Sequence, residues 1–416
     1  MVIIQKICKD MITNSHPSIK SLINSALSNN ATFNTLKECR KNFIVNALVC
    51  FSAIKGKINF LQMERFSKKC EQYFRINFAK KLNFQGLNLS MIKEKIGECI
   101  VAFDPSYIHK SGKKTFGLGM YWSGCAGAMK RGLEICGFAA VDVALNTAFH
   151  LNAIQTPKSK ELNLLQYYCQ IIKENYSSFK ELTSYLVADS YFAKAEVVQT
   201  ITALKMHFIS RLRDDAQLYY PSNGQKTGRK GRTKKYAGRV DPKHPDMNFF
   251  TLCCNTAELK VYNAIVYCTA FDKRKINLSI AVFYKNGKEV ARKLYFSTDL
   301  GMEGMKIVSY YRSRFQIEFL YRDAKQHCGL EDCQARSANK LNFHFNAALT
   351  TVNIAKLHWL DVRKSESEAF SMANFKTLCH NRLLLDRFFS AFAINPNSPK
   401  NQRIINELVK FGSIAA

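Results

Sequence analysis

ECIVAFDPS, at residues 98–106, opens with an apolar run and ends in Asp-Pro. A run of this kind bounded by a turn signal predicts a buried strand that ends at Asp104. Segments with helical spacing at 159–182 and 192–204 alternate with further strand-like runs. Those runs are LEICGFAAVDVAL (133–145), TAFHLNAIQ (147–155), SYLVADS (184–190) and HFISRLR (207–213). Strands that alternate with helices predict the α/β class, with a mixed sheet.

The regions on either side of this alternation have different patterns. Residues 1–97 show helical spacing and carry 16 Lys and Arg against 5 Asp and Glu. This is typical of a small basic helical domain that binds DNA, although a helical packing cap would have the same pattern. Residues 214–300 predict a β-rich insertion, with a hairpin turn at Asn286-Gly287. From Glu303 the chain is predicted to be helical, with a C-terminal helical region at 341–416.

The charge of the chain points to a polyanionic partner. Lys and Arg total 61 and Asp and Glu 32 in 416 residues, a net charge of +29. Double-stranded DNA is the first candidate, and the composition suggests neither a membrane nor a small-molecule substrate. The 14 cysteines include no C-x-x-C pair, and the N-terminus lacks the order of a signal peptide. We therefore expect reduced thiols and a cytoplasmic location.

A glycine-rich basic stretch, GQKTGRKGRTKKYAGR, occupies residues 224–239. Such runs are most often solvated loops. In a chain with this net charge the stretch is also a candidate arm that holds the DNA backbone. Its seven candidate DNA-binding residues are Lys226, Arg229, Lys230, Arg232, Lys234, Lys235 and Arg239.

The segment SYYRSRFQIEFLYRDAKQHCGL, residues 309–330, gathers charged groups on one predicted helix face. At roughly 100° per residue, Tyr311, Arg314, Glu318 and Lys325 project within an arc of about 60°. A solvated face with spaced ion pairs is one interpretation. The other is a phosphate-binding face, because Arg binds phosphate oxygens through two donors and Lys supplies a compact charge.

Two aspartates at predicted strand ends complete a candidate catalytic site. Asp104 follows the strand at 98–103, and Asp189 follows the strand at 184–188. Each has a simpler interpretation, because Asp104 begins an Asp-Pro turn and Asp189 precedes a helix that it could cap. With Glu318 they form a set of hard oxygen ligands suited to a pair of Mg²⁺ ions. Glu134, Asp142, Asp214 and Asp215 are other acids that could bind the metal.

These residues resemble a known family. Y-x2-R-x3-E-x6-K is the signature of DDE transposases of the insertion sequence four family, and Tyr311, Arg314, Glu318 and Lys325 fill its four positions. The blocks AFDPSYIHKSGKKTFGLG and VADSYFAK resemble those that hold the family's first two acids. The resemblance extends over about residues 97–356. This chain has Phe315 where the family often has Trp after the motif Arg.

The resemblance implies a ribonuclease-H-like catalytic domain at 98–340, with the β-rich insertion between Asp189 and Glu318. It implies that these two acids and Asp104 hold two Mg²⁺ ions, for which Mn²⁺ can substitute. The implied activity is cleavage at terminal inverted repeats and transfer of the freed 3′-hydroxyl to target DNA. A homodimer on DNA, associated with a bacterial nucleoid, is the implied assembly.

Three other functions compete with an active transposase. A domesticated or decayed transposase would bind DNA without cutting it. A related ribonuclease-H-like nuclease, such as a resolvase, would not need the Tyr, Arg and Lys of the helix face. A cationic RNA-binding protein would not need Asp104, Asp189 and Glu318 to converge.

Overall fold

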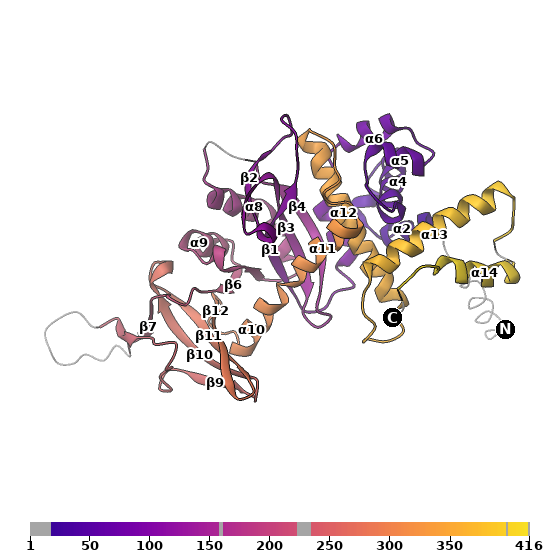
Figure 1. Cartoon of the computed structure of the whole chain (residues 1–416). Helices are drawn as coiled ribbons and strands as arrows, with labels where there is room; N and C mark the ends of the chain where they lie inside the picture. The colour runs from indigo at the N-terminus through magenta and orange to yellow at the C-terminus, as the bar shows by residue number, and fades with distance from the viewer. Residues whose placement is uncertain (1–17, 158–160, 223–233, 397, 415–416) are drawn as a thin grey trace.

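The computed structural model describes residues 18–157, 161–222, 234–396 and 398–414 (Figure 1). One mixed sheet runs through the middle of the molecule, in the order β2-β3-β1-β5-β6-β12-β11-β10-β7-β8. Its first part is formed by β1 (Cys99–His109), β2 (Gly119–Ser123), β3 (Ala128–Asp142), β4 (Thr147–Gln155), β5 (Tyr185–Ala188) and β6 (His207–Arg211). The α/β class predicted from the sequence is confirmed.

The centre of this sheet combines parallel and antiparallel pairs. β1 pairs antiparallel with β3 along its whole length, and parallel with β5, which in turn pairs parallel with β6. β3 pairs with β2 at one end and with β4 at the other. The helices α8 (Leu164–Lys180) and α9 (Ala195–Ala203) supply the connections that parallel strands require.

The prediction that the first strand ends at Asp104 is wrong. β1 continues through Pro105 to His109 because β3 pairs with every residue of it, from Cys99 opposite Asp142 to His109 opposite Gly132. Pro105 has no N–H to donate, but the pairing with β5 stops before it, at Phe103. The Asp-Pro signal therefore marks the end of one pairing rather than the end of the strand.

The stretch predicted to be β-rich extends the same sheet. It holds β7 (Leu218–Pro221), β8 (Tyr236–Arg239), β9 (Thr251–Asn255), β10 (Leu259–Cys268), β11 (Arg274–Lys285) and β12 (Lys288–Ser297). β12 pairs antiparallel with β6, so these strands join the core sheet. The predicted turn at Asn286-Gly287 is confirmed, because both residues have positive φ and Lys285 pairs with Lys288.

The segment predicted as one helix at 309–330 is two helices. α10 (Gly304–Ser313) ends before Arg314, and α11 (Gln316–His327) begins after Phe315. The amide groups of Phe315, Ile317 and Glu318 each donate to the carbonyl three residues before, at 3.0–3.2 Å. This tighter local winding means that the four residues of the predicted face come from two helices rather than one, although Arg314 still contacts Tyr311 and Glu318.

Helices from both ends of the chain cover the end of the sheet formed by β4. The N-terminal part forms α2 (Ile19–Leu27), α3 (Ala31–Asn34), α4 (Glu38–Ala53), α5 (Phe60–Phe66), α6 (Glu71–Phe78) and α7 (Phe84–Ile92). The C-terminal part forms α12 (Ala338–Val362), α13 (Met372–Ala391) and α14 (Pro399–Val409). α12 contacts α2, α4, α6 and α7 as well as β4, and all belong to one buried core.

Polar side chains of α12 complete the outer edge of β4. Asn346 accepts from the amide of Ala153 and donates to its carbonyl, both at 2.9 Å. Asn353 does the same for His150, at 2.7 and 2.8 Å. The Lys356 ammonium donates to the Ala148 carbonyl at 2.7 Å. Buried polar residues on α12 thus take the place of a further strand.

Candidate active site

The parallel pairing of β1 and β5 brings two aspartates to the same edge. Phe103 is opposite Ala188, and the next residue on each strand is Asp104 and Asp189. The Asp189 carboxylate accepts from the Tyr191 amide at 3.0 Å, so it caps the short 3-10 turn Ser190–Phe192 and not α9, whose N-cap residue is Lys194. The backbone carbonyl of Asp189 accepts from the Ser210 hydroxyl at 2.8 Å. This hydrogen bond also holds Asp189 to β6.

Arg314 links the first aspartate to the glutamate on α11. One guanidinium nitrogen lies 3.5 Å from the Asp104 carboxylate, and another lies 3.1 Å from the Glu318 carboxylate. Arg314 is 9 % exposed, and its Nε and Nη1 have no hydrogen-bond partner among the described residues. A buried guanidinium with donors to spare can donate to further oxygen atoms, such as those of a phosphate.

The charges of these groups shift one another's pKa values. Burial raises the pKa of Asp104; Arg314 lowers it, Asp189 and Glu318 raise it further, and the resulting pKa is about 7. Burial likewise raises the pKa of Asp189, and Arg314 opposes the shift. Burial alone would lower the pKa of Arg314, but Asp104, Tyr311, Glu318 and Asp189 together raise it. The site therefore concentrates negative charge that one guanidinium neutralises only in part.

Tyr321 and Gly137 form a pair that the sequence did not reveal. The Tyr321 hydroxyl donates to the Asp104 carbonyl at 2.7 Å, and Tyr321 is 5 % exposed. Gly137 is opposite Asp104 on β3, and a Cβ at this position would lie 1.9 Å from the Tyr321 hydroxyl oxygen. Gly137 therefore leaves room for Tyr321, the α11 side chain that binds the Asp104 backbone.

The other residues of the predicted face have separate contacts. The Tyr311 ring packs on Tyr295, with centroids 4.8 Å apart, and the Arg314 guanidinium carbon lies 5.8 Å from the Tyr311 ring. The Lys325 ammonium donates to the Tyr107 carbonyl at 2.8 Å, farther along β1 than Asp104. Arg314 is thus in contact with Tyr311 and Glu318, while Lys325 is bound to the strand.

A fourth acid, Glu134, lies on the opposite face of β3. It is buried, and its carboxylate accepts from the Tyr168 hydroxyl at 2.7 Å. Burial raises its pKa, and the hydrogen bonds from Tyr168 and Thr156 lower it. Because side chains alternate across a strand, Glu134 faces α8 while Gly137, opposite Asp104, faces α11. Glu134 is therefore a structural acid behind the site.

Only part of the basic stretch at 224–239 belongs to the described residues. Lys226, Arg229, Lys230 and Arg232 lie outside the described residues. Lys234, Lys235 and Arg239 are exposed at or beside β8, and the Lys235 ammonium lies 4.9 Å from the Tyr267 ring centroid. These three residues belong to the far end of the sheet from β2.

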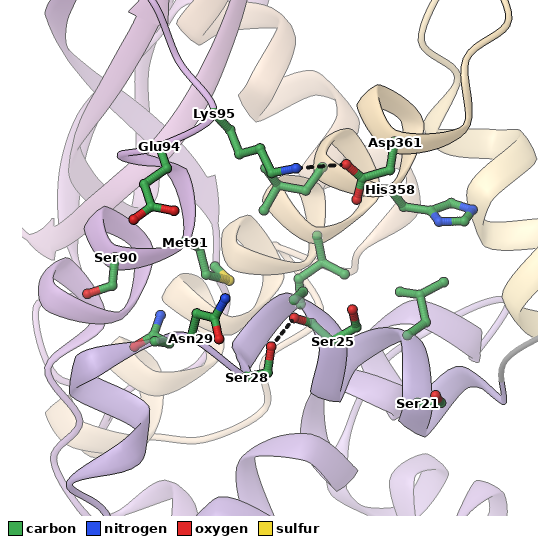
Figure 2. A pocket seen from close by; sticks show the side chains of 15 residues that line it. Ser21, Ser25, Ser28, Asn29, Ser90, Met91, Glu94, Lys95, His358 and Asp361 are labelled. Atoms are coloured by element: carbon green, nitrogen blue, oxygen red, sulfur yellow. Dashed lines mark hydrogen bonds and ion pairs between the residues drawn. The ribbon is translucent and has the colours of Figure 1, made fainter. Parts of the chain in front are cut away.

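A hollow of about 450 Å³ lies away from the carboxylates, between α2, α7 and α12 (Figure 2). Its lining includes Ser21, Ser25, Ser90 and Glu94. Lys95 and Asp361 form an ion pair at 2.9 Å in this lining, so their two charges neutralise each other. We interpret the hollow as a gap between helices, because it contains no strained or uncompensated catalytic group.

The chemistry of the carboxylates suits divalent cations. Asp104, Asp189 and Glu318 offer hard oxygen ligands, and a bound cation would offset the burial and the neighbouring acids that raise the pKa of Asp104. Among the described residues, however, no group of three or more His, Cys, Asp or Glu is placed to hold a metal ion. Glu318 is paired with Arg314, so a shared site requires Glu318 to turn from that guanidinium.

Comparison with known protein families identifies the catalytic part of the chain. The family model described as "Transposase DDE domain" matches residues 98–354, which is well over half of the chain. That span begins just before β1 and ends within α12, so it contains Asp104, Asp189, Arg314 and Glu318. No curated protein matches the chain.

Proposed function

The chain belongs to the family of transposase DDE domains, and we propose that it is the transposase of an insertion sequence. The proposed reaction is metal-dependent cleavage at terminal inverted repeats, followed by transfer of the freed 3′-hydroxyl to target DNA. The observation that carries the proposal is the alignment of Asp104 with Asp189 at the end of the β1–β5 pairing, with Arg314 joining Asp104 to Glu318.

The proposed roles follow from these positions. Asp104, Asp189 and Glu318 would hold two Mg²⁺ ions, or Mn²⁺ in their place, and the bound ions would act as Lewis acids on the attacking and leaving oxygens. Arg314, whose Nε makes neither a hydrogen bond nor an ion pair within the described residues, would hold the phosphate beside the scissile bond. Tyr311 and Lys325 would position the DNA strand on either side of Arg314.

Two finer assignments belong to the same proposal. The strand order β4-β3-β1-β5-β6, antiparallel up to β1 and parallel beyond it, supports a ribonuclease-H-like domain. The four residues Tyr311, Arg314, Glu318 and Lys325 support assignment to the insertion sequence four family. A basic N-terminal helical region that binds DNA, and a homodimer that holds two DNA ends, complete the proposal.

A cleavage assay tests the proposal. The DNA flanking the gene is searched for inverted repeats, and a duplex that ends in them is incubated with the protein and Mg²⁺. Cleavage at the repeat ends, abolished by EDTA and restored by Mn²⁺, is the expected result. Asp104→Asn, Asp189→Asn and Glu318→Gln should each remove cleavage while DNA binding remains. Glu94→Gln, at an exposed acid beside the hollow, is the matched control and should cut normally.

The second candidate is a domesticated transposase that binds DNA without cutting it. The pairing of Glu318 with Arg314 is the observation that favours it, because this pair keeps Glu318 from the aspartates. Specific binding to the repeats without cleavage in Mg²⁺ or Mn²⁺ would support this candidate against the first.

A further inference from the structure

An exposed apolar strip lies on the hairpin formed by β2 and the first part of β3. We call residues 119–123 and 128–132 the ribbon. Met120 is 45 % exposed, Trp122 59 % and Met129 53 %. Trp122 is opposite Met129, and Met120 is opposite Arg131, so these four side chains share one face. Single exposed apolar residues are common, but a contiguous strip with a Trp marks an interaction surface.

The strip lies on the same face of the sheet as Asp104. Asp104 is opposite Gly137 on β3, and the pairing between β1 and β3 has no bulge. Side chains alternate along a strand, so Met129 and Arg131 point to the same side as Gly137. The strip therefore lies on the side of the sheet where a ligand of the carboxylates would bind.

α11 connects the two places. Glu318 lies near Asp104, Tyr321 binds the Asp104 carbonyl, and Lys325 binds the Tyr107 carbonyl three residues farther along β1. α11 thus runs along β1 from the carboxylates toward the ribbon. A ligand that extends from the site along α11 reaches the ribbon next.

The surroundings of the strip are positively charged. Residues 105–133 contain no Asp or Glu and five Lys or Arg. Lys113, Lys114 and Lys130 are exposed, and Arg131 donates to the Gly112 carbonyl at 3.0 Å. This charge suits a polyanion, and it opposes the docking of another positively charged surface of the same chain against the strip.

The geometry points to the ribbon as a second DNA contact, in which Trp122 packs against the duplex beyond the cleaved end. The inference rests on the proposed function, since it takes the DNA at Asp104 as its starting point. Gly137 and Met129 are eight residues apart on β3. At roughly 3.3 Å per residue and 3.4 Å per base pair, Trp122 contacts DNA about eight base pairs from the cleaved phosphate. Met120 and Met129 shape the apolar surface, and Arg131, on the same face, contacts the backbone.

Footprinting and affinity measurements on the full chain test this contact. In wild-type protein we expect hydroxyl-radical protection about eight base pairs from the cut, besides protection at the cut itself. Trp122→Ala should remove the outer protection and weaken the affinity by roughly tenfold, as for the loss of a large aromatic side chain from an interface. Because Trp is neutral, the salt dependence of binding should not change. Arg131→Ser should instead lower the salt slope by about 0.9.

The controls separate this contact from the other possibilities. Phe392→Ala removes an aromatic side chain that is 66 % exposed at the end of α13, and it should leave the footprint unchanged. If Trp122→Ala left protection and affinity at the wild-type level, the inference would be overturned. If it instead dissociated a dimer in the absence of DNA, the strip would be a protein interface and the inference wrong. Wild-type cleavage is scored separately, so a protein that binds with the outer footprint but never cuts would contradict the proposed function alone.

Discussion

Gly137 is the single position where one added carbon should disturb the site most. A Cβ there would lie 1.9 Å from the Tyr321 hydroxyl and 2.8 Å from the adjacent ring carbon, so Gly137→Ala forces the ring away from Asp104. We expect the free energy of unfolding to fall by about 1–3 kcal/mol, as for other overpacked cores. The cleavage rate should fall by more than the loss of folded protein explains. Chemical denaturation and the cleavage assay measure the two effects.

Tyr321→Phe separates the hydrogen bond from the packing. It keeps the ring and removes only the donor to the Asp104 carbonyl, which costs about 1 kcal/mol when the carbonyl is left unpaired. Cleavage should fall less than in Gly137→Ala. Wild-type cleavage in both variants would show that Asp104 is held without this contact.

Lys356 gives the stability a pH dependence of known sign. Burial lowers the pKa of Lys356 to about 8, whereas an unfolded lysine titrates near 10.4. Between these values the unfolded chain holds more protons, so this lysine makes stability rise with pH; below pH 8 the cost of burying its charge is fully present. Lys356→Met removes that cost but leaves the Ala148 carbonyl without its donor.

The free energy of unfolding of Lys356→Met minus that of the wild type should therefore fall as the pH rises from about 8 to 10. Urea denaturation at several pH values measures it. Lys340→Met, at the start of the same helix, is the matched control. A difference that rose with pH, or did not change, would contradict the buried-charge account.

At the scale of elements, the break between α10 and α11 determines what Arg314 can do. Arg314 is the C-cap residue of α10, and Glu318 lies in the first turn of α11, so the guanidinium at the break reaches both Asp104 and Glu318. Arg314→Lys keeps one charge but cannot span both carboxylates with a planar group. Cleavage should fall by at least tenfold, whereas DNA affinity should stay within about twofold, because many other basic residues hold the duplex.

Arg312→Lys is the matched control for this change, since Arg312 is exposed on the same helix. Single-turnover cleavage and fluorescence anisotropy measure rate and affinity separately. Equal losses of both in Arg314→Lys would assign Arg314 to general DNA binding and contradict a role beside the scissile bond.

The sequence predicted elements where local patterns agree with tertiary pairing. The strand before Asp189 and the Asn286-Gly287 turn are of this kind, because a short apolar run and a turn with positive φ need no distant information. Asp104-Pro105 was misread as a turn because pairing with β3, some 30 residues away, overrides it. The helix break at Phe315 contains neither Gly nor Pro, so no local signal marks it.

The candidate site was predictable to a similar extent. Its acids and Arg314 stand in a recognisable motif, and their spacing suggested a common face. The Tyr321–Gly137 contact joins residues 184 positions apart that carry no chemical signature of their own. The same holds for the ribbon, because exposure of Trp122 depends on the register of β2 with β3.

At the scale of the whole molecule, the net charge of +29 predicts binding that depends steeply on salt. The sheet spreads this charge over a long surface, with the ribbon at its β2 end and Lys234, Lys235 and Arg239 at its β8 end. The two ends should contact different parts of the DNA. Their contributions to the salt dependence should then be independent.

Changing both ends together tests this arrangement. Replacing Lys234, Lys235 and Arg239 by Ser should reduce the slope of log K against log salt by about 0.9 for each lost phosphate contact, without altering sequence preference. Adding Arg131→Ser should lower the slope by the same further amount as in the wild type, because the ribbon holds separate phosphates. Filter binding from 50 to 400 mM salt, on repeat and unrelated duplexes, gives the slopes. If the combined loss were smaller than the sum, both ends would compete for the same stretch of DNA, and the duplex could not lie along the sheet.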